Sequence, residues 1–320
     1  MDAARLQAVE KSFGTQHAVQ GLDLVIPAGQ TCGLIGPSGA GKSTTIRIIM
    51  SILFPDSGRV EVLGRPSALE AKDRIGYLPE ERGVYRKMTV GAFLKYLAGL
   101  KGAPESRSMP RARRLLEQLG LADIEKKKCE DLSKGMLQRV QFVGAIVHEP
   151  ELLILDEPFS GLDPVSVRLL KDVIAEEKQR GATILFSTHV MAQAEELCDR
   201  VVMIHKGAKV LDEGMSKLRR RFDNRRVLFE PLDAAADGRV LRDVPGVLSV
   251  QPGGGEYELT LAAGADPAAV IRDAATRLAP ARVEIARMRL EDTFVSIVRE
   301  GRESEQALRE HLQGLTGAAE

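Results

Sequence analysis

One stretch of this chain, GPSGAGKST from Gly36 to Thr44, constrains its fold more than any other. It matches the pattern G-x-x-x-x-G-K-[ST] and lies between QTCGLIG, which has the pattern of a buried strand, and KSTTIRIIMSIL, which has the pattern of a helix. Glycines let backbone N–H groups turn toward a bound anion, and a helix N-terminus adds the positive end of its dipole. This setting predicts an α/β fold with a phosphate-binding loop.

The chemistry of the loop assigns a role to two of its side chains. Lys42 places a positive charge toward the β and γ phosphates of a nucleotide, and Ser43 offers a hydroxyl to Mg²⁺. We therefore expect ATP and Mg²⁺ as cofactors. The whole stretch is predicted to bind the nucleotide: Gly36, Pro37, Ser38, Gly39, Ala40, Gly41, Lys42, Ser43 and Thr44.

A second stretch, LLILDEP from Leu152 to Pro158, predicts a buried strand that ends in two carboxylates. Asp156, at the end of the strand, is placed to hold the magnesium shell. Glu157 points to the other side of the strand end, where a base or an orienting group for the attacking water is needed. The two motifs together predict nucleoside triphosphate hydrolysis.

Strand and helix patterns alternate from the N-terminus to about Gly214, as in an α/β domain. The runs LLILD, ATILFST and RVVMIH are almost wholly apolar, which is typical of strands buried on both faces. We assign residues 1–222 to this domain, with a helical subdomain at about residues 85–146.

The last third of the chain changes in composition. The strand-like runs RVLFE, GVLSV, YELTLA and RVEIARM surround the helical DPAAVIRDAATRLA, which predicts a small ferredoxin-like α+β domain over residues 223–300. That domain ends with a predicted helix, LEDTFVSIVRE. Residues 301–320 are charged and lack an apolar stripe, so we expect a flexible tail.

The composition excludes several classes of protein. With 45 basic and 45 acidic residues the net charge is zero, which argues against a nucleic acid as the main partner. The three cysteines show neither disulfide nor zinc-site spacing. The first residues lack a secretory signal, and no uncharged apolar run approaches the ~20 residues of a membrane-spanning helix. We expect a reduced, cytoplasmic protein that relies on another chain for any membrane span.

Three further segments resemble motifs of the ABC-type ATPases. LSKGMLQRV, Leu132 to Val140, resembles their LSGGQ signature; SGLDP, Ser160 to Pro164, resembles the D-loop; and STH, Ser187 to His189, resembles the segment of the switch histidine. Order and spacing agree from about Leu6 to Gly214. The resemblance implies the P-loop NTPase fold of an ABC ATPase domain.

The resemblance also implies an ATP site shared by two head-to-tail copies. Ser133 and Gly135 of one copy would contact the γ-phosphate held by Lys42 of the other. Asp163, in the D-loop-like segment, belongs by the same resemblance to the ATP-binding set.

Two further roles follow from the same similarity. His189 would bind the γ-phosphate and help position Glu157, which makes Lys42, Glu157 and His189 the catalytic set. Phe13 takes the place of the aromatic residue, usually tyrosine, that stacks on adenine, and stacking requires only a ring. A guanine-specific NKxD motif is absent from the sequence, which argues against a GTPase.

This sequence departs from the family pattern in two places. Lys134 and Met136 replace the second Gly and the Gln of LSGGQ, so we expect a changed rate of hydrolysis at an intact site. In GYLPEERGVY, Glu80 stands where the family usually carries the Q-loop glutamine. Its carboxylate is a Mg²⁺ ligand, a water-mediated contact, or a group that swings away before nucleotide binds. Arg82 and Tyr85 are candidates for a permease-facing surface or for a solvated turn.

The segment YLPEERG and the added C-terminal domain resemble ATPases that serve ABC-2-type exporters, such as the bacterial sodium-extrusion and drug-export branches. This implies a peripheral subunit at the cytoplasmic face of the plasma membrane, paired with a second ATPase subunit and a separate integral-membrane permease. Two alternatives stay open. One is a soluble ABC ATPase of DNA repair or translation, and the other is a regulatory or dimerising protein with slow ATPase activity.

Overall fold

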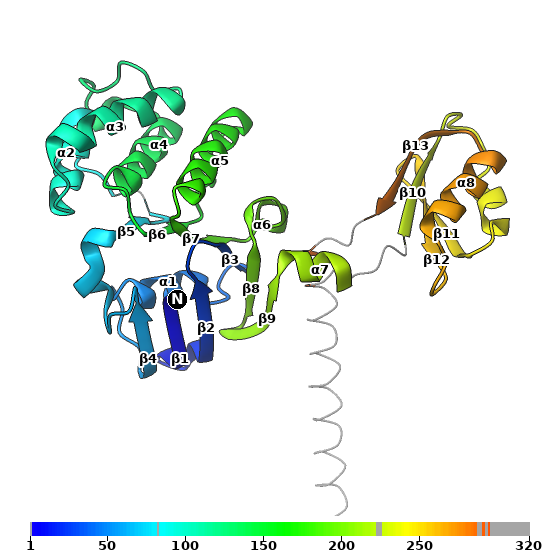
Figure 1. Ribbon diagram of the computed structural model, residues 1–320, viewed down its shortest axis with the longest axis horizontal. Helices are drawn as coiled ribbons and strands as arrows, with labels where there is room; N and C mark the ends of the chain where they lie inside the picture. Colours follow the sequence, from blue (N-terminus) through cyan, green and yellow to red (C-terminus); the bar gives the residue numbers. More distant parts are fainter. Residues whose placement is uncertain (1, 82, 222–225, 287–289, 292–293, 295–320) are drawn as a thin grey trace, which may run out of the picture. The chain divides into compact units, whose positions relative to one another are not determined.

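The computed structural model describes residues 2–81, 83–221, 226–286, 290–291 and 294. Its chain divides into two compact units, Met1–Met215 and Ser216–Glu320 (Figure 1). Arg82, the tail at 301–320 and most of the predicted helix LEDTFVSIVRE lie outside the described residues.

A six-stranded sheet forms the centre of the first unit, in the order β5-β6-β7-β3-β8-β9. Five strands are parallel, and β9 pairs antiparallel with β8. All residues of β3, β6 and β7 are buried, as expected of strands that are covered on both faces, and in β7 these include Thr183, Ser187 and Thr188. The strands are β3 (Thr31–Ile35), β5 (Ile75–Leu78), β6 (Leu152–Asp156), β7 (Thr183–Thr188), β8 (Arg200–His205) and β9 (Ala208–Gly214).

A second, antiparallel sheet lies in the same unit, in the order β2-β1-β4. Its strands are β1 (Asp2–Phe13), β2 (Gln16–Pro27) and β4 (Ser57–Val62). Side chains of this sheet share one apolar core with α1 (Lys42–Ile49) and with the central sheet; Leu24, Ile46 and Ile154 are examples. The core therefore holds the start of α1 firmly against both sheets.

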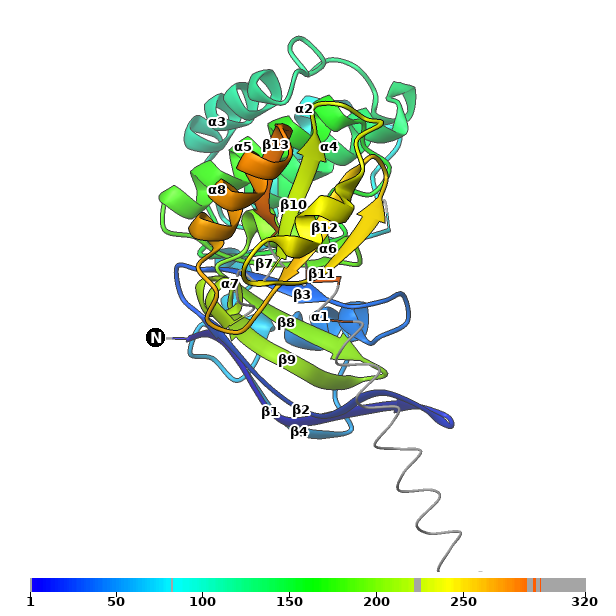
Figure 2. The ribbon, with the colours of Figure 1, turned by 90° about the vertical axis from the view of Figure 1, so that its right-hand side faces the viewer.

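Helices complete the first unit. Among them, α5 (Pro164–Gln179) follows β6, and α6 (Met191–Leu197) contacts β3 and β7 of the central sheet. The helices α2 (Val90–Leu100), α3 (Glu105–Gln118) and α4 (Lys134–Ile146) contact one another and form a helical layer that lies away from β1, β2 and β4 (Figures 1 and 2). A short 3₁₀ turn at Ala68–Arg74 precedes β5, and another at Cys129–Asp131 lies between α3 and α4.

Caps explain where these helices begin. Thr89, Ser133 and Asp163 are the N-cap residues of α2, α4 and α5, and each side chain accepts a hydrogen bond from a backbone N–H of the first turn. Pro164 follows Asp163 at the first helical position, where the missing N–H costs nothing.

One helix is shorter than its sequence predicts. KSTTIRIIMSIL reads as a helix to Leu53, but α1 ends at Ile49. Ser51 has φ +54°, in the left-handed region, and its side chain forms a hydrogen bond with that of Ser67. The helix therefore ends before Ser51, which leaves the helical conformation and contacts a residue 16 positions further along the chain.

The second unit has the predicted ferredoxin-like order. The sheet β11-β12-β10-β13 is antiparallel throughout and is covered by α8 (Pro267–Arg277). A 3₁₀ turn, Gly238–Asp243, takes the place of the first helix of this order, and Tyr257 packs so closely on Gly238 that a Cβ there would lie 2.3 Å from its ring. The remaining elements are α7 (Met215–Arg221), β10 (Arg226–Pro231), β11 (Val247–Gly253), β12 (Glu256–Leu261) and β13 (Pro280–Ala286).

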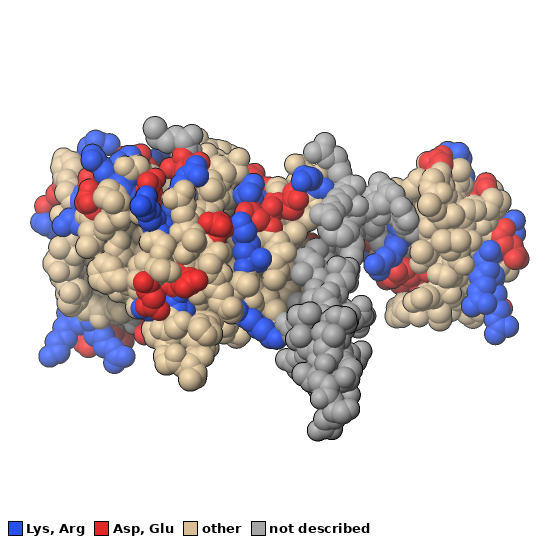
Figure 3. All heavy atoms as spheres, turned by 90° about the horizontal axis from the view of Figure 1, so that it is seen from below, with Lys and Arg blue, Asp and Glu red and all other residues tan. Residues whose placement is uncertain are grey.

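Surface charge is mixed, as the equal numbers of basic and acidic residues predict. On the face shown in Figure 3, Lys and Arg side chains alternate with Asp and Glu side chains over the first unit. Among the described residues, no helix combines the length and the apolar content that crossing a membrane requires.

Candidate functional site

The phosphate loop joins β3 to α1 at the carboxyl end of the central sheet. Gly36 and Gly41 have φ +150° and +109°, and a Cβ at these positions would lie 2.2 Å from the Ile204 carbonyl oxygen and 2.3 Å from that of Ala18. Only glycine fits where the backbone passes so close to its neighbours. The conformation directs the start of α1 into the loop, where its N–H groups would face a bound anion.

Lys42 lies inside this loop. Its side chain is 6% exposed, and Nζ donates hydrogen bonds to the carbonyl oxygens of Gly36 and Pro37 at 2.9 and 3.1 Å. Burial lowers the pKa of the ammonium group, and the carboxylates of Glu157, Asp156 and Glu80 act against this shift. The nearby carboxylates thus help to keep Lys42 charged for a phosphate ligand.

Asp156 ends β6 beside the loop and is 2% exposed. Its Oδ1 accepts a hydrogen bond from Ser43 Oγ at 3.3 Å and another from the hydroxyl of Ser187 in β7. A buried carboxylate is thereby satisfied by two hydroxyls from different elements. The contact brings the two predicted metal-binding side chains of Ser43 and Asp156 together.

These two side chains offer the oxygen donors that Mg²⁺ requires. The described residues contain no cluster of three or more acidic, histidine or cysteine side chains suited to a metal. Mg²⁺ commonly binds proteins through one or two side-chain oxygens and completes its shell with substrate phosphates and water. Ser43 and Asp156 fit that mode, and the ion would neutralise charge on the β and γ phosphates.

Glu157 and His189 form a polar pair at the same edge. His189 Nδ1 lies 2.9 Å from Glu157 Oε1, and the Glu157 backbone N–H donates to Ser187 Oγ at 3.1 Å. A carboxylate accepts only, so Nδ1 carries the proton of this contact. Glu157 has φ +50°, a left-handed conformation that costs a non-glycine residue about 1 to 3 kcal/mol. The fold thus holds this carboxylate in a strained, fixed position.

The signature-like residues lie at the start of α4. Ser133 accepts a hydrogen bond from the Met136 N–H at 3.3 Å and thereby caps the helix. A Cβ on Gly135 would lie 3.5 Å from Leu162, so this turn sits next to the D-loop-like segment. Within the described part of the chain, no hydrogen bond or ion pair joins Ser133 or Gly135 to the phosphate loop.

The carboxylate of Asp163 is hydrogen-bonded to Ser166 in the first turn of α5. It accepts hydrogen bonds from Ser166 N and Ser166 Oγ at 3.0 and 2.5 Å, and the Ser166 hydroxyl holds the pKa of Asp163 below its usual range. Asp163 therefore fixes the start of α5.

Phe13 and Glu80 are both exposed. The Phe13 ring, 50% exposed at the β1–β2 turn, has Lys11 Nζ 5.7 Å from its centre. Glu80 follows β5, is exposed, and lies close enough to Lys42 to influence its pKa.

Sequence reasoning did not assign a role to three polar residues near the site. Ser187 contacts both Asp156 and the Glu157 backbone. Gln138 Nε2 donates to the Pro158 carbonyl at 2.6 Å, and Gln141 Nε2 donates to that of Gly83 at 3.1 Å. The two glutamines connect α4 to the turns after β6 and β5. The only available signal was their polarity on an otherwise apolar helix face.

Three groups of side chains meet where β3, β6 and β7 end: a buried lysine in a glycine loop, an Asp–Ser pair and a Glu–His pair. This arrangement can bind a triphosphate, hold its metal and orient a water molecule for attack. Fold and site together define a P-loop nucleoside triphosphatase.

Comparisons with known proteins identify the family. A family model described as ABC transporter matches residues 19–160. The uncharacterized ABC transporter ATP-binding protein YhaQ of Bacillus subtilis (strain 168) is 45% identical over 240 residues, 75% of this chain and 80% of that protein. The lantibiotic transport ATP-binding protein SrtF of Streptococcus pyogenes is 33% identical over 229 residues, 71% of this chain and 98% of that protein.

Solved structures agree with this result. The ATP-binding subunit of an ABC transporter superposes with a TM-score of 0.65 at 33% identity, covering 69% of this chain and 93% of that one. The chain belongs to the ATP-binding proteins of ABC transporters, which bind ATP and hydrolyse it to power transport. The resemblance inferred from the motifs is confirmed at this level.

Proposed function

We propose that this protein powers the export of a solute through a separate ABC-2-type permease, as a peripheral subunit at the cytoplasmic face of the plasma membrane. The Glu157–His189 pair beside Ser43, Asp156 and Lys42 carries the proposal, because it supplies the parts that ATP hydrolysis needs. A relative that is named for lantibiotic transport supports the export branch.

In the proposed reaction, the Glu157 carboxylate accepts a hydrogen bond from the attacking water and then its proton. His189 holds Glu157 through Nδ1–H, and in the imidazolium form its Nε2–H would donate to an oxygen of the γ-phosphate. Lys42 and the N–H groups of the loop stabilise the negative charge of the phosphates. Mg²⁺ at Ser43 and Asp156 is part of this proposal.

We further propose that two copies pair head to tail around ATP. Ser133 and Gly135 lie at an exposed helix start in the described first unit, and no hydrogen bond or ion pair there joins them to its own phosphate loop. A helix start presents N–H groups to an anion, so a second copy could place this turn against the γ-phosphate. For the C-terminal unit we propose a role in stabilising the dimer.

A groove in the first unit offers a place for the permease. It has a volume of about 310 Å³ and lies between the segment after β5 and the helices α2 and α4. Its lining is mainly apolar and includes Leu78, Tyr85, Phe93 and Leu97. Glu80 and Gly83 belong to the same segment, which therefore connects the groove with the region of Lys42.

Co-purification tests the proposal. The full chain, tagged and isolated from detergent-solubilised membranes of the cells that produce it, should bring down an integral-membrane protein. The pair, reconstituted in vesicles, should then move a solute only when ATP is hydrolysed, and the Glu157→Gln variant should not. Recovery of ribosomes or DNA without a membrane protein would contradict the transport role.

A further inference from the structure

A second cavity in the first unit is unrelated to the ATP site. It has a volume of about 420 Å³ and is formed by the α2–α3 connection, the first half of α3 and the end of α4. Such a volume suits a small ligand. Its charged and hydroxyl-bearing lining consists of Lys101, Arg107, Ser108, Arg111, Arg114 and Glu149.

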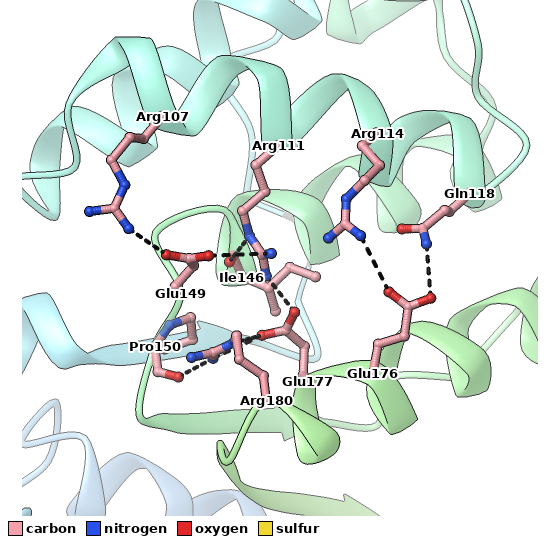
Figure 4. A network of polar contacts seen from close by, with 10 residues as sticks. All are labelled: Arg107, Arg111, Arg114, Gln118, Ile146, Glu149, Pro150, Glu176, Glu177 and Arg180. Carbon is pink, nitrogen blue, oxygen red and sulfur yellow. Dashed lines mark hydrogen bonds and ion pairs between the residues drawn. The ribbon is translucent and has the colours of Figure 1, made fainter.

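The lining carries four cations against one carboxylate. Arg107 and Arg111 converge on Glu149 at 3.0 and 3.6 Å, while Arg114 forms one ion pair, at 3.8 Å, with Glu176 outside the cavity (Figure 4). A guanidinium has five N–H donors, so these arginines keep donors beyond those used here. The cavity is therefore a place of excess positive charge with hydrogen-bonding capacity for a further anion.

The cation at the base of this cavity is fixed. The Arg111 side chain is 12% exposed, donates to the Ile146 carbonyl and pairs with Glu177 of α5, which is itself 3% exposed. Arg180 pairs with the same carboxylate at 2.9 Å and holds it from the other side (Figure 4). Arg111 cannot swing out to water without breaking this buried network.

A buried hydroxyl adds to the polar character of the wall. Ser108 is 2% exposed, and within the described part of the chain its Oγ has no hydrogen-bond partner. Buried polar atoms are normally satisfied, so an unpaired hydroxyl in the lining of a cavity that also has four cations is unusual for a site that only stabilises the fold.

We propose that this cavity binds the phosphate group of a small molecule or of a lipid headgroup. Arg107 and Arg114, 76% and 54% exposed, would reach the phosphate from the rim, and Arg111 would hold it from below. Planar guanidinium groups match phosphate oxygens in pairs, which favours phosphate over a simple halide. The inference does not depend on the proposed transport role.

The cavity adjoins the apolar groove beside α2, because Lys101 and His148 line both. A bound phosphate would act on both side chains and so on the wall of the groove. His148 is also a natural reporter, since a nearby anion favours its charged form and raises its pKa.

Isothermal titration with inorganic pyrophosphate tests the proposal. Wild type should bind two equivalents per chain, one at the phosphate loop and one at the α3 cavity, and Lys42→Ala should keep only the second. Arg107→Glu with Arg114→Glu should weaken that second site at least about tenfold. Arg272→Glu, a charge reversal on α8 in the other unit, is the matched control.

Two readouts complete the test. The His148 ring resonances should shift with pyrophosphate in Lys42→Ala but not after the double reversal. Phosphatidylglycerol vesicles, compared with phosphatidylcholine vesicles, distinguish the sources, because a lipid headgroup gives sedimentation that the double reversal abolishes, and a free phosphate compound gives none. Pyrophosphate and vesicle binding that match the Arg272→Glu control in the doubly reversed chain would overturn the proposal.

Discussion

At the scale of single residues, the site depends on one strained carboxylate. Glu157 adopts φ +50°, and it is held there by its backbone contact to Ser187 and its side-chain contact to His189. Strain of this kind persists only where surrounding contacts enforce it, and it occurs often at functional sites. This geometry therefore supports a functional role for Glu157, which its position after a strand would not support by itself.

We expect Glu157→Gln to bind ATP but to lose turnover. The amide keeps the shape and the contact to His189 but is a poor proton acceptor, so the hydrolysis rate should fall by about 10² to 10⁴. Size-exclusion chromatography with ATP should show a dimer that persists. Glu61→Gln, an exposed substitution on β4, should leave the rate unchanged. Near-normal hydrolysis by Glu157→Gln would contradict the assignment.

Glu80 permits a separate test of magnesium binding. If its carboxylate contributes to the magnesium shell, Glu80→Gln should raise the Mg²⁺ concentration for half-maximal ATPase activity by about tenfold. Glu81→Gln is the matched control, because Glu81 is 91% exposed and lies 3.9 Å from Arg47. The same Mg²⁺ dependence and the same stimulation by the permease in wild type and Glu80→Gln would show that Glu80 has no such role.

At the scale of elements, the sequence predicts strands better than it predicts contacts between them. The run LLILD coincides with β6 and RVVMIH with β8, because strands buried on both faces must be apolar throughout. Near the end of α1, Ser51 contacts Ser67, and at the start of the 3₁₀ turn Gly238 packs against Tyr257, both residues distant in sequence. A local pattern does not contain that information.

The candidate site shows the same division. Lys42, Ser43, Asp156 and Glu157 could be predicted from their motifs, because each motif carries its chemistry locally. The role of Ser187 could not, because it depends on β7 lying beside β6, with Ser187 opposite Asp156.

A glycine on β5 tests the packing between elements. A Cβ on Gly76 would lie 2.1 Å from the Ala145 carbonyl oxygen, so Gly76→Ala must push α4 away from β5. We expect a loss of about 1 to 3 kcal/mol in the free energy of unfolding, measured by urea titration. Gly99→Ala on α2 is the control: its Cβ meets nothing within 4 Å, and alanine favours a helix, so stability should stay equal or rise by up to about 1 kcal/mol. Equal stabilities for the two variants would contradict the close contact.

At the scale of the whole molecule, strand order brings distant segments together. The strands β6, β7 and β3 are neighbours in the sheet although β3 precedes the other two by more than 100 residues. Their carboxyl ends therefore meet at one edge, which is where open α/β sheets bind ligands. The charged cavity beside α3, in contrast, belongs to the helical layer and not to this edge of the sheet.

Protonation of His148 links that helical region to the stability of the first unit. Burial is the main cause that lowers the pKa of His148 from 6.5 to about 4, and Lys101 adds to the effect, while the hydrogen bond with the Ile75 carbonyl opposes it. Between pH 6.5 and about 4, the unfolded chain therefore binds a proton at His148 that the folded chain does not bind. This contribution to stability is complete above pH 6.5 and is lost progressively as the pH falls toward 4.

We expect the first unit to lose on the order of 1 to 2 kcal/mol more stability between pH 7.5 and 5 in wild type than in His148→Gln. The glutamine amide can still donate to the Ile75 carbonyl but does not titrate. Three of the four tyrosines, Tyr77, Tyr85 and Tyr96, lie in this unit, so near-UV circular dichroism during urea unfolding follows it. Buffers must be free of phosphate, because an anion in the α3 cavity would raise the pKa of His148 and reduce the difference. Parallel stability curves for the two proteins across this pH range would show that His148 does not carry the effect.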